Sequence, residues 1–452
     1  MKYPTHYFLG LLLFFGALPA HAYESEFTFG SYGRVGLSTD EGLARPERRQ
    51  ITSVGPRLIQ NNYLELDLGM GWRPNKIGDV AVKTTVAYLD RLPHETADFD
   101  SRIAVRQAFL SVEGIAGTGF FTWLGSRMAR GDDIYLLDTW VMDDLNIVGL
   151  GTGWRNPSMD ASLILGLNQP MRRDVVQRIA TPNVGFGEAI TTDLNRQRAI
   201  VAPMVEKRYG GTKGALGMKV RLYSEIHYLP AGERRLETVG DTEPLPDDRG
   251  FLLGAQFGIW NFARNGHLNV WARYASGLAA YDELQQPYGL NRDRRADDAR
   301  EFRLAFSGNY ETDRFGLMFG SYFRVFRDAD ANEEDFDDRQ EWVTAVRALY
   351  FRGVFTPGIE ASSQMLRTNG LNPQTDEQST AFIHQVALIP ALSFGPSQGS
   401  YNRPQLQFIA AMTSMNQAAL DLFPVDDQRS KDSLSWYFGL RAEWWFGRGG
   451  GY

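Results

Sequence analysis

The chain has 452 residues, with 47 Lys and Arg against 54 Asp and Glu, which gives a formal net charge of −7 at pH 7. This acidic balance argues against a nucleic-acid-binding protein, which usually carries a basic excess or stripe. Cysteine is absent, so disulfides, zinc–thiolate sites and thiol nucleophiles are excluded. With 13% aromatic residues and 46 glycines, the composition argues against disorder and favours a β-rich chain.

The first 22 residues have the pattern of an export signal. Lys2 is followed by an apolar run over residues 8–16, and Ala20-His21-Ala22 forms a small-x-small cleavage pattern. A single membrane anchor is the weaker interpretation, because the apolar run is too short to span a bilayer comfortably. The sequence therefore predicts a signal peptide over 1–22 and a mature chain over 23–452. No further apolar run of about 20 residues follows, which argues against a helical membrane protein.

Apolar and polar residues alternate with a period of two through the mature chain. In residues 63–70, leucine and methionine alternate with Tyr63, Glu65, Asp67 and Gly69. Such alternation predicts strands with one apolar and one polar face. Eighteen candidate strands follow from this pattern, near 27–37, 60–71, 79–89, 103–113, 119–126, 145–154, 159–167, 197–208, 215–229, 250–260, 266–276, 300–310, 314–326, 341–351, 354–366, 381–393, 403–414 and 434–446.

The connections between these candidate strands alternate strictly between long and short. Long polar connections, of which 38–59 is the first, alternate with short ones such as 73–76. This is typical of an outer-membrane β-barrel, whereas a soluble sandwich does not need it and a propeller would show a repeat. The sequence thus predicts an all-β, 18-stranded antiparallel transmembrane β-barrel with long outer loops. Barrels of this size enclose water, so the polar face should line a channel, including Arg34, Glu65, Asp67, Arg441 and Glu443.

Enzyme motifs are missing from the sequence. There is no G-x-S-x-G elbow, H-E-x-x-H motif or Walker loop. The acidic stretch 329–338 could suggest a calcium loop, but it lacks the glycine and ligand spacing of an EF-hand and is better interpreted as a charged outer loop. We therefore predict no catalytic residue, no metal site and no cofactor.

Residues 122–140 resemble the strand and inward-folded constriction loop of the maltoporin family. The match runs from Thr122-Trp123-Leu124-Gly125-Ser126-Arg127 to Leu137-Asp138-Thr139-Trp140. The stretches 29–34, 63–69, 402–404 and 436–445 resemble further strands of the family. The resemblance implies a trimeric, 18-stranded sugar porin of the Gram-negative outer membrane, with one loop folded into the channel. The strand count made above agrees with it.

The resemblance also implies roles for individual residues. Maltoporins carry a row of aromatic side chains along which sugar rings slide, and the positions that match it here are Tyr32, Tyr63 and Trp445, with Tyr401 where the family has Trp and Trp271 as the best further candidate. Trp140 matches the aromatic that narrows the channel opposite this row. Charged positions of the flanking polar tracks are matched by Arg34, Glu65, Asp133 and Asp138, with Arg130 as the basic residue beside the loop. Strand parity adds Arg441 and Glu443. Tyr135 stands where the family usually has histidine.

The chemistry suits a sugar channel. The flat C–H face of a sugar ring can lie on an aromatic ring, while its hydroxyls bond to charged side chains. The expected partners are a sugar or oligosaccharide, outer-membrane lipid and two further copies in a homotrimer, with no nucleic acid. A general or anion-selective diffusion porin is the alternative function. An outer-membrane enzyme or adhesin is a third, without supporting motifs.

Overall fold

The computed structural model describes residues 25–73, 77–89, 103–169, 174–183, 187–211, 214–236, 241–282, 285, 287–331, 335–372 and 374–447. Two predicted features lie outside the described residues: the signal peptide over 1–22 and the connection 90–102. Within the part of the chain that is described, no helix is long and apolar enough to cross a membrane.

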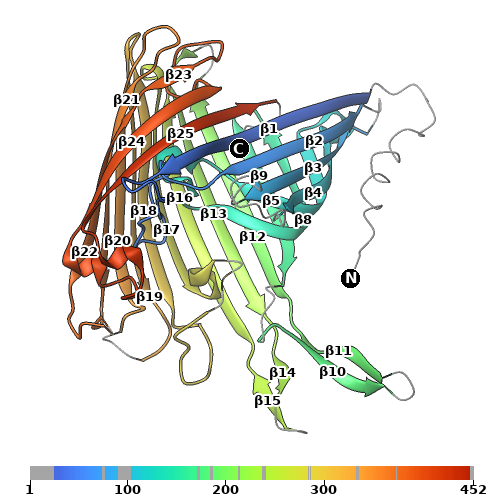
Figure 1. The fold of residues 1–452 in the computed structure, drawn as a ribbon. Coiled ribbons are helices and arrows are strands. Elements are labelled where there is room, and N and C mark those ends of the chain that lie inside the picture. The colour runs from blue at the N-terminus through green and yellow to red at the C-terminus, as the bar shows by residue number, and fades with distance from the viewer. Residues whose placement is uncertain are drawn as a thin grey trace.

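Eighteen antiparallel strands form one closed barrel (Figure 1), as the sequence predicted. Its first and last strands pair with each other, Tyr32 opposite Trp445, so the sheet has no free edge. One barrel strand is interrupted at Pro390, and both of its parts pair with β24. The strands are β1 (Ser25–Thr39), β2 (Tyr63–Trp72), β3 (Asp79–Leu89), β4 (Ile103–Glu113), β5 (Phe120–Arg130), β8 (Asp144–Asn156), β9 (Met159–Asn168), β12 (Arg198–Gly210), β13 (Gly217–Leu229), β16 (Asp248–Trp260), β17 (Arg264–Gly277), β18 (Arg300–Glu311), β19 (Phe315–Arg327), β20 (Arg339–Tyr350), β21 (Gly358–Thr368), β22 (Thr380–Ile389) continued by β23 (Ala391–Ser393), β24 (Gln405–Met415) and β25 (Leu434–Phe446).

The two faces of the barrel wall differ in polarity as expected. In β25, Leu440 is 48% exposed on the outside, while its neighbours Arg441 and Glu443 point inward and are 7% and 1% exposed. The same alternation places Ile359 outside and Glu360 inside on β21. Because an apolar outer face and a polar interior are what a lipid-embedded barrel requires, the predicted assignment of the faces is confirmed.

Long connections gather at one end of the barrel and short turns at the other, because consecutive antiparallel strands alternate in direction. Two long connections contain hairpins that extend beyond the barrel at the bottom of Figure 1. These are β10 (Val176–Asn183) with β11 (Gly187–Asn195), and β14 (Gly232–Arg235) with β15 (Thr242–Leu245). Among the described residues, the short helical elements are η2 (Ile115–Gly117), η3 (Tyr135–Leu137), η5 (Leu278–Tyr281), α3 (Gln417–Leu420) and η6 (Gln428–Ser430).

The connection 131–143 folds into the barrel, as the resemblance implied. It contains β6 (Asp133–Ile134), η3 and β7 (Thr139–Trp140). Ile134 and Met142 are fully buried, and Ile134 packs against Gly320 of β19 on the far wall. Since Asp138 at the other side of the segment pairs with Arg34 of β1, the segment crosses the lumen.

The second part of the connection 40–62, over residues 50–60, also lies inside the barrel, which corrects the prediction of a polar loop over 38–59. Leu58 is 1% exposed and packs in a buried cluster with residues of β22, β24 and β25. Its carbonyl accepts a 2.8 Å hydrogen bond from Arg441, and the Ser53 amide donates a 2.8 Å hydrogen bond to Glu341. The physical reason is that Ile51, Val54, Leu58 and Ile59 give this connection an apolar surface to bury.

Candidate functional site

A cavity of about 410 Å³ lies where the two inward segments meet the wall formed by β1, β2 and β25. We call it the constriction cavity. Most of the predicted site residues line it together: Tyr32, Arg34, Tyr63, Arg130, Asp133, Asp138, Trp140, Tyr401 and Trp445. Four residues absent from the predicted set complete the lining, namely Arg57, Leu89, Arg106 and Tyr135.

Aromatic rings form a row around this cavity. Tyr32 and Tyr63 on adjacent strands have ring centroids 5.7 Å apart, and Tyr32 is the register partner of Trp445. Tyr135, from the segment that crosses the lumen, lies 6.2 Å from the Trp445 ring and 5.4 Å from the Tyr401 ring. Rings from the wall, the crossing segment and the turn 394–404 therefore converge on one space.

Guanidinium groups lie against the faces of several of these rings. The Arg57 carbon is 4.3 Å from the Tyr135 centroid, that of Arg403 is 4.4 Å from Trp445, and that of Arg130 is 4.0 Å from Trp140. Such cation–π contacts hold both the ring and the cation in place. The rings are thus presented to the cavity by a positively charged scaffold.

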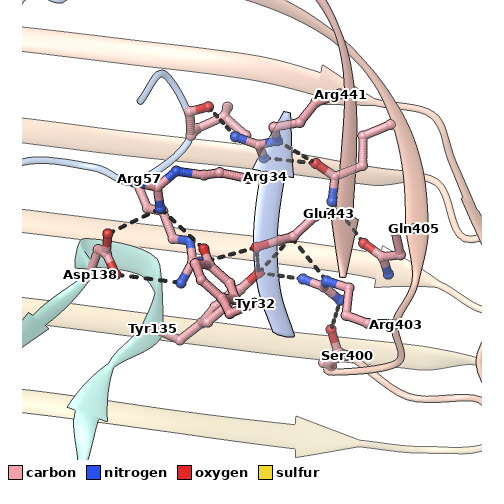
Figure 2. Close-up of polar contacts among 12 residues, drawn as sticks. Tyr32, Arg34, Arg57, Tyr135, Asp138, Ser400, Arg403, Gln405, Arg441 and Glu443 are labelled. Carbon is pink, nitrogen blue, oxygen red and sulfur yellow. Dashed lines mark hydrogen bonds and ion pairs between the residues drawn. The ribbon is translucent and has the colours of Figure 1, made fainter. Parts of the chain in front are cut away.

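Glu443 is the centre of a buried ionic network (Figure 2). Its carboxylate accepts hydrogen bonds from Arg57 at 2.7 Å and Arg403 at 2.9 Å, and it is 1% exposed. The Tyr135 hydroxyl donates a further hydrogen bond of 3.2 Å to the same carboxylate. A buried carboxylate needs partners of this kind, because an uncompensated charge is costly away from water. Glu443 therefore holds the inward segments to β25 and does not face the cavity.

Asp138 connects the crossing segment to β1 and to the 40–62 segment. It pairs with Arg34 at 3.1 Å and with Arg57 at 3.7 Å. Burial alone would raise the pKa of Asp138, but the two arginines outweigh burial and lower it. For Asp133, burial dominates and raises the pKa to about 6, with Arg57 acting in the opposite direction. The two carboxyl groups of the segment thus differ in their proton affinity.

Four predicted site residues do not line the cavity. Glu65 is 3% exposed and is paired with Arg106 at 3.0 Å, and Arg441 holds the 40–62 segment from behind. Trp271 points into the barrel but is fully buried in the cluster that includes Met142, so its ring offers no surface to a solute. Glu443 is the fourth, for the reason given above.

Nothing in the sequence indicated that Arg106 and Arg57 would line the constriction cavity. Arg106 is the extra residue of a bulge in β4, between Val105 and Gln107, which pair with consecutive residues of β3. Strand parity fails at a bulge, because two residues then oppose one. Arg57 belongs to a connection that was expected to lie outside. Arg403, in contrast, stands directly before Pro404 in a stretch that resembled the family.

One group of acidic side chains among the described residues has the spacing of metal ligands. Asp328, Asp335 and Asp338 each offer an oxygen, and these oxygens lie within 4.8 Å of one another. The group lies in the connection after β19, away from the constriction cavity. Acidic groups of this kind are common without an ion, so the cluster is not part of the site.

Comparison with known proteins places these features in a family. A family model described as LamB porin matches residues 27–446, nearly the whole chain. No curated protein matches the chain at a significant level.

Solved structures with a similar course of the chain are outer-membrane proteins. The channel DcaP of Acinetobacter baumannii is 9% identical, with 95% of this chain and 99% of that chain covered and a TM-score of 0.48. OccK2 of Pseudomonas aeruginosa is 10% identical over 94% and 98% of the two chains, with a TM-score of 0.43. OmpT of Vibrio cholerae is 11% identical over 95% and 99%, with a TM-score of 0.42. With TM-scores below 0.5, these likenesses support no statement about solute or assembly.

Proposed function

The chain belongs to the LamB porin family, and from this premise we propose that it is a channel for the facilitated diffusion of sugars. The protein is an outer-membrane β-barrel, so solutes pass through its lumen and meet the constriction cavity. One observation carries the proposal: Tyr32, Tyr63, Trp140, Tyr401 and Trp445 line the same cavity.

Stacking would supply the affinity. Each ring of the row can receive the C–H face of a sugar without demanding a fixed pattern of hydroxyls. Neighbouring rings such as Tyr32 and Tyr63, with centroids 5.7 Å apart, would let a sugar move from one platform to the next. Passage requires binding that is favourable yet shallow and repeated, and a row of similar sites meets that requirement.

Polar groups at the cavity would exchange hydrogen bonds with the sugar hydroxyls. Arg34, Arg130, Asp133 and Asp138 line it and belong to both charge types. Charge-assisted hydrogen bonds to such groups would replace water lost at the constriction. No catalytic role is assigned to any of them, since a channel of this kind needs no chemical step.

The proposal includes lipid and two further copies as partners. The apolar outer face of the strands would contact outer-membrane lipid. A homotrimer is proposed from the resemblance to the maltoporin family and from the preference of homo-oligomers for closed symmetry.

A general or anion-selective porin is the second candidate, and the charge of the cavity favours it. Four arginines line the cavity against two aspartates, Asp133 and Asp138. Such a porin would conduct ions through the same barrel and would not be blocked by sugars.

Single-channel conductance with a panel of neutral oligosaccharides tests the proposal. The expected result is an ion current that maltotriose and related sugars block reversibly, with a concentration dependence that gives the affinity. A current that no sugar blocks would favour the general porin, and the absence of any current would remove both candidates.

A further inference from the structure

Arginines line the lumen from the end with the long connections down to the constriction cavity. Next to that cavity lies a smaller one of about 50 Å³, lined by Arg34, Arg45, Arg48 and Arg441. Among the described residues that line this smaller cavity, none carries a carboxylate. A space bordered by four cations and no anion is a site of positive potential.

This smaller cavity shares lining residues with two larger ones. It shares Arg34 with the constriction cavity. It shares Arg45 and Arg48 with a cavity of about 270 Å³ bordered by the long connections 40–49 and 428–432. A solute that moves along this wall therefore meets Arg45 and Arg48 first, then Arg34, and finally the aromatic row.

Arg48 is available to a passing solute. Its side chain is exposed to the lumen, and within the described ranges it has neither an ion pair nor a hydrogen bond. Arg48 and Arg34 line the same small cavity, and two like charges gain from an anion placed between them.

Two carboxylates beside the constriction are already engaged by arginines. Asp138 is held by Arg34 and Arg57, and Glu443 by Arg57 and Arg403. Each of these acids is shared by two arginines. The lining of the 270 Å³ cavity is balanced, with four carboxylates and four arginines, so the cationic excess begins at the smaller cavity. The constriction cavity repeats this excess, with four arginines against two aspartates in its lining.

We propose that the preferred solute is an acidic oligosaccharide, whose carboxylate or sulfate groups follow the arginines while its sugar rings follow the aromatic row. The inference rests on the proposed sugar channel and adds the charge of the solute. A guanidinium fork matches planar carboxylates and sulfate or phosphate oxygens, so a solute with both sugar rings and anionic groups uses every feature of the wall.

The test compares trisaccharides of similar size and different charge in planar bilayers. The probes are trigalacturonate, a sulfated trisaccharide, maltotriose and the glucosamine trimer, each added to the mature protein. At 0.1 M salt we expect the acidic trisaccharides to block at about tenfold lower concentration than maltotriose, the low end of what a focused field gives. The advantage should shrink at 1 M salt, where the Debye length falls from about 10 Å to about 3 Å. The acidic probe that blocks at the lower concentration shows whether the channel prefers carboxylate or sulfate groups.

A pair of matched variants isolates the arginine path. Arg48→Gln should weaken the block by the acidic sugar about threefold and leave the block by maltotriose unchanged, since one exposed charge is lost. Arg178→Gln makes the same charge change on the exposed hairpin beyond the barrel, and it should change neither the block by the acidic sugar nor the block by maltotriose. A further measurement uses the unaltered protein: its reversal potential in a KCl gradient should show a preference for anions.

The other outcomes are separable. Equal block by acidic and neutral trisaccharides, or stronger block by the cationic trimer, would overturn the inference and leave the sugar channel in place. Anion current with no block by any sugar would overturn both the inference and the proposed function.

Discussion

The hydroxyl of Tyr135 donates a 3.2 Å hydrogen bond to the carboxylate of Glu443 and accepts one from Arg403. Tyr135 and Glu443 are 308 positions apart in the chain. Through this contact the segment that crosses the lumen is attached to the last strand, so the width of the constriction depends on a buried polar network and not on apolar packing alone.

Removal of that hydroxyl should loosen the crossing segment. We expect Tyr135→Phe to cost about 1 kcal/mol, because Arg403 and Glu443 each lose a partner in a buried site. Hydrogen exchange of the peptide 131–143 should quicken, and the open-channel current should become noisier. The matched control is Tyr437→Phe on β25, whose hydroxyl has no hydrogen bond within the described residues. Equal effects of the two variants would contradict the role given to Tyr135.

Trp445 and Trp444 are neighbours with opposite orientations, and they should respond differently to truncation. Trp445 lines the constriction cavity, so Trp445→Ala should weaken sugar block by roughly 1 kcal/mol, about fivefold. Trp444 lies against Gly33 on the outer face and donates a 3.1 Å hydrogen bond to Ser31. Trp444→Ala should lower the temperature of heat modification and leave sugar affinity nearly unchanged. The reverse pattern would show that the wall aromatics are not the binding platforms.

Ion selectivity should change as the pH falls through about 6. Burial raises the pKa of Asp133 to about 6, so its carboxyl group gains a proton below that pH and the cavity loses a negative charge. The ratio of anion to cation permeability should then rise about twofold, from the Coulomb energy of one charge across a watery pore. Reversal potentials measured between pH 5 and pH 8 give this ratio.

The variant Asp133→Asn should show the higher ratio of anion to cation permeability at every pH. Burial also raises the pKa of Asp143 to about 6, but Asp143 does not line the cavity and is paired with Arg221 at 2.9 Å. Asp143→Asn is therefore the control that should retain the pH step. If this control abolished the step and Asp133→Asn did not, the titrating group would be Asp143.

Export should remove residues 1–22. The apolar run and the Ala20-His21-Ala22 pattern predict cleavage before Tyr23. Sequencing of the membrane-purified protein from its N-terminus should give Tyr-Glu-Ser-Glu. A chain that still begins at Met1 in the outer membrane would contradict the prediction.

The proposed trimer should survive mild detergent and dissociate on heating. Unheated gel electrophoresis should show a band at three times the chain mass that collapses to one chain mass after boiling, and mass photometry should give the same ratio. If both measurements showed only monomers, the proposed trimer would be wrong, whereas the proposed channel within each chain would not be affected.

The sequence predicted the barrel because its signal is repeated in every strand. Leu440, Arg441 and Glu443 show why: alternation around a two-residue period places each side chain inside or outside. Such a rule needs no knowledge of distant contacts. The same rule collected Tyr32 and Trp445 on one side of the wall, where their register now makes them partners.

The parts that could not be predicted depend on contacts far apart in the chain. The burial of Leu58 and the place of Arg57 follow from a connection that enters the lumen and meets β25, and the apolar residues of that connection do not by themselves specify which strand they meet. Arg106 reached the cavity through a bulge, and a bulge breaks the parity count. Trp271 is fully buried in a cluster that includes Met142 of the crossing segment, so a correct strand register alone does not decide which rings a solute can reach.

The network around Glu443 also bears on the order of assembly. Arg57 belongs to the first of the long connections and Tyr135 to the third, and both are bonded to Glu443 on the final strand. Contacts at such separations form late, since long stretches of chain must be ordered before they can be made. The pairing of β1 with β25 and the docking of the inward segments onto Glu443 are therefore coupled, and a barrel that has not closed lacks a finished constriction. Closure of the wall and completion of the passage through it become one event in the maturation of the protein.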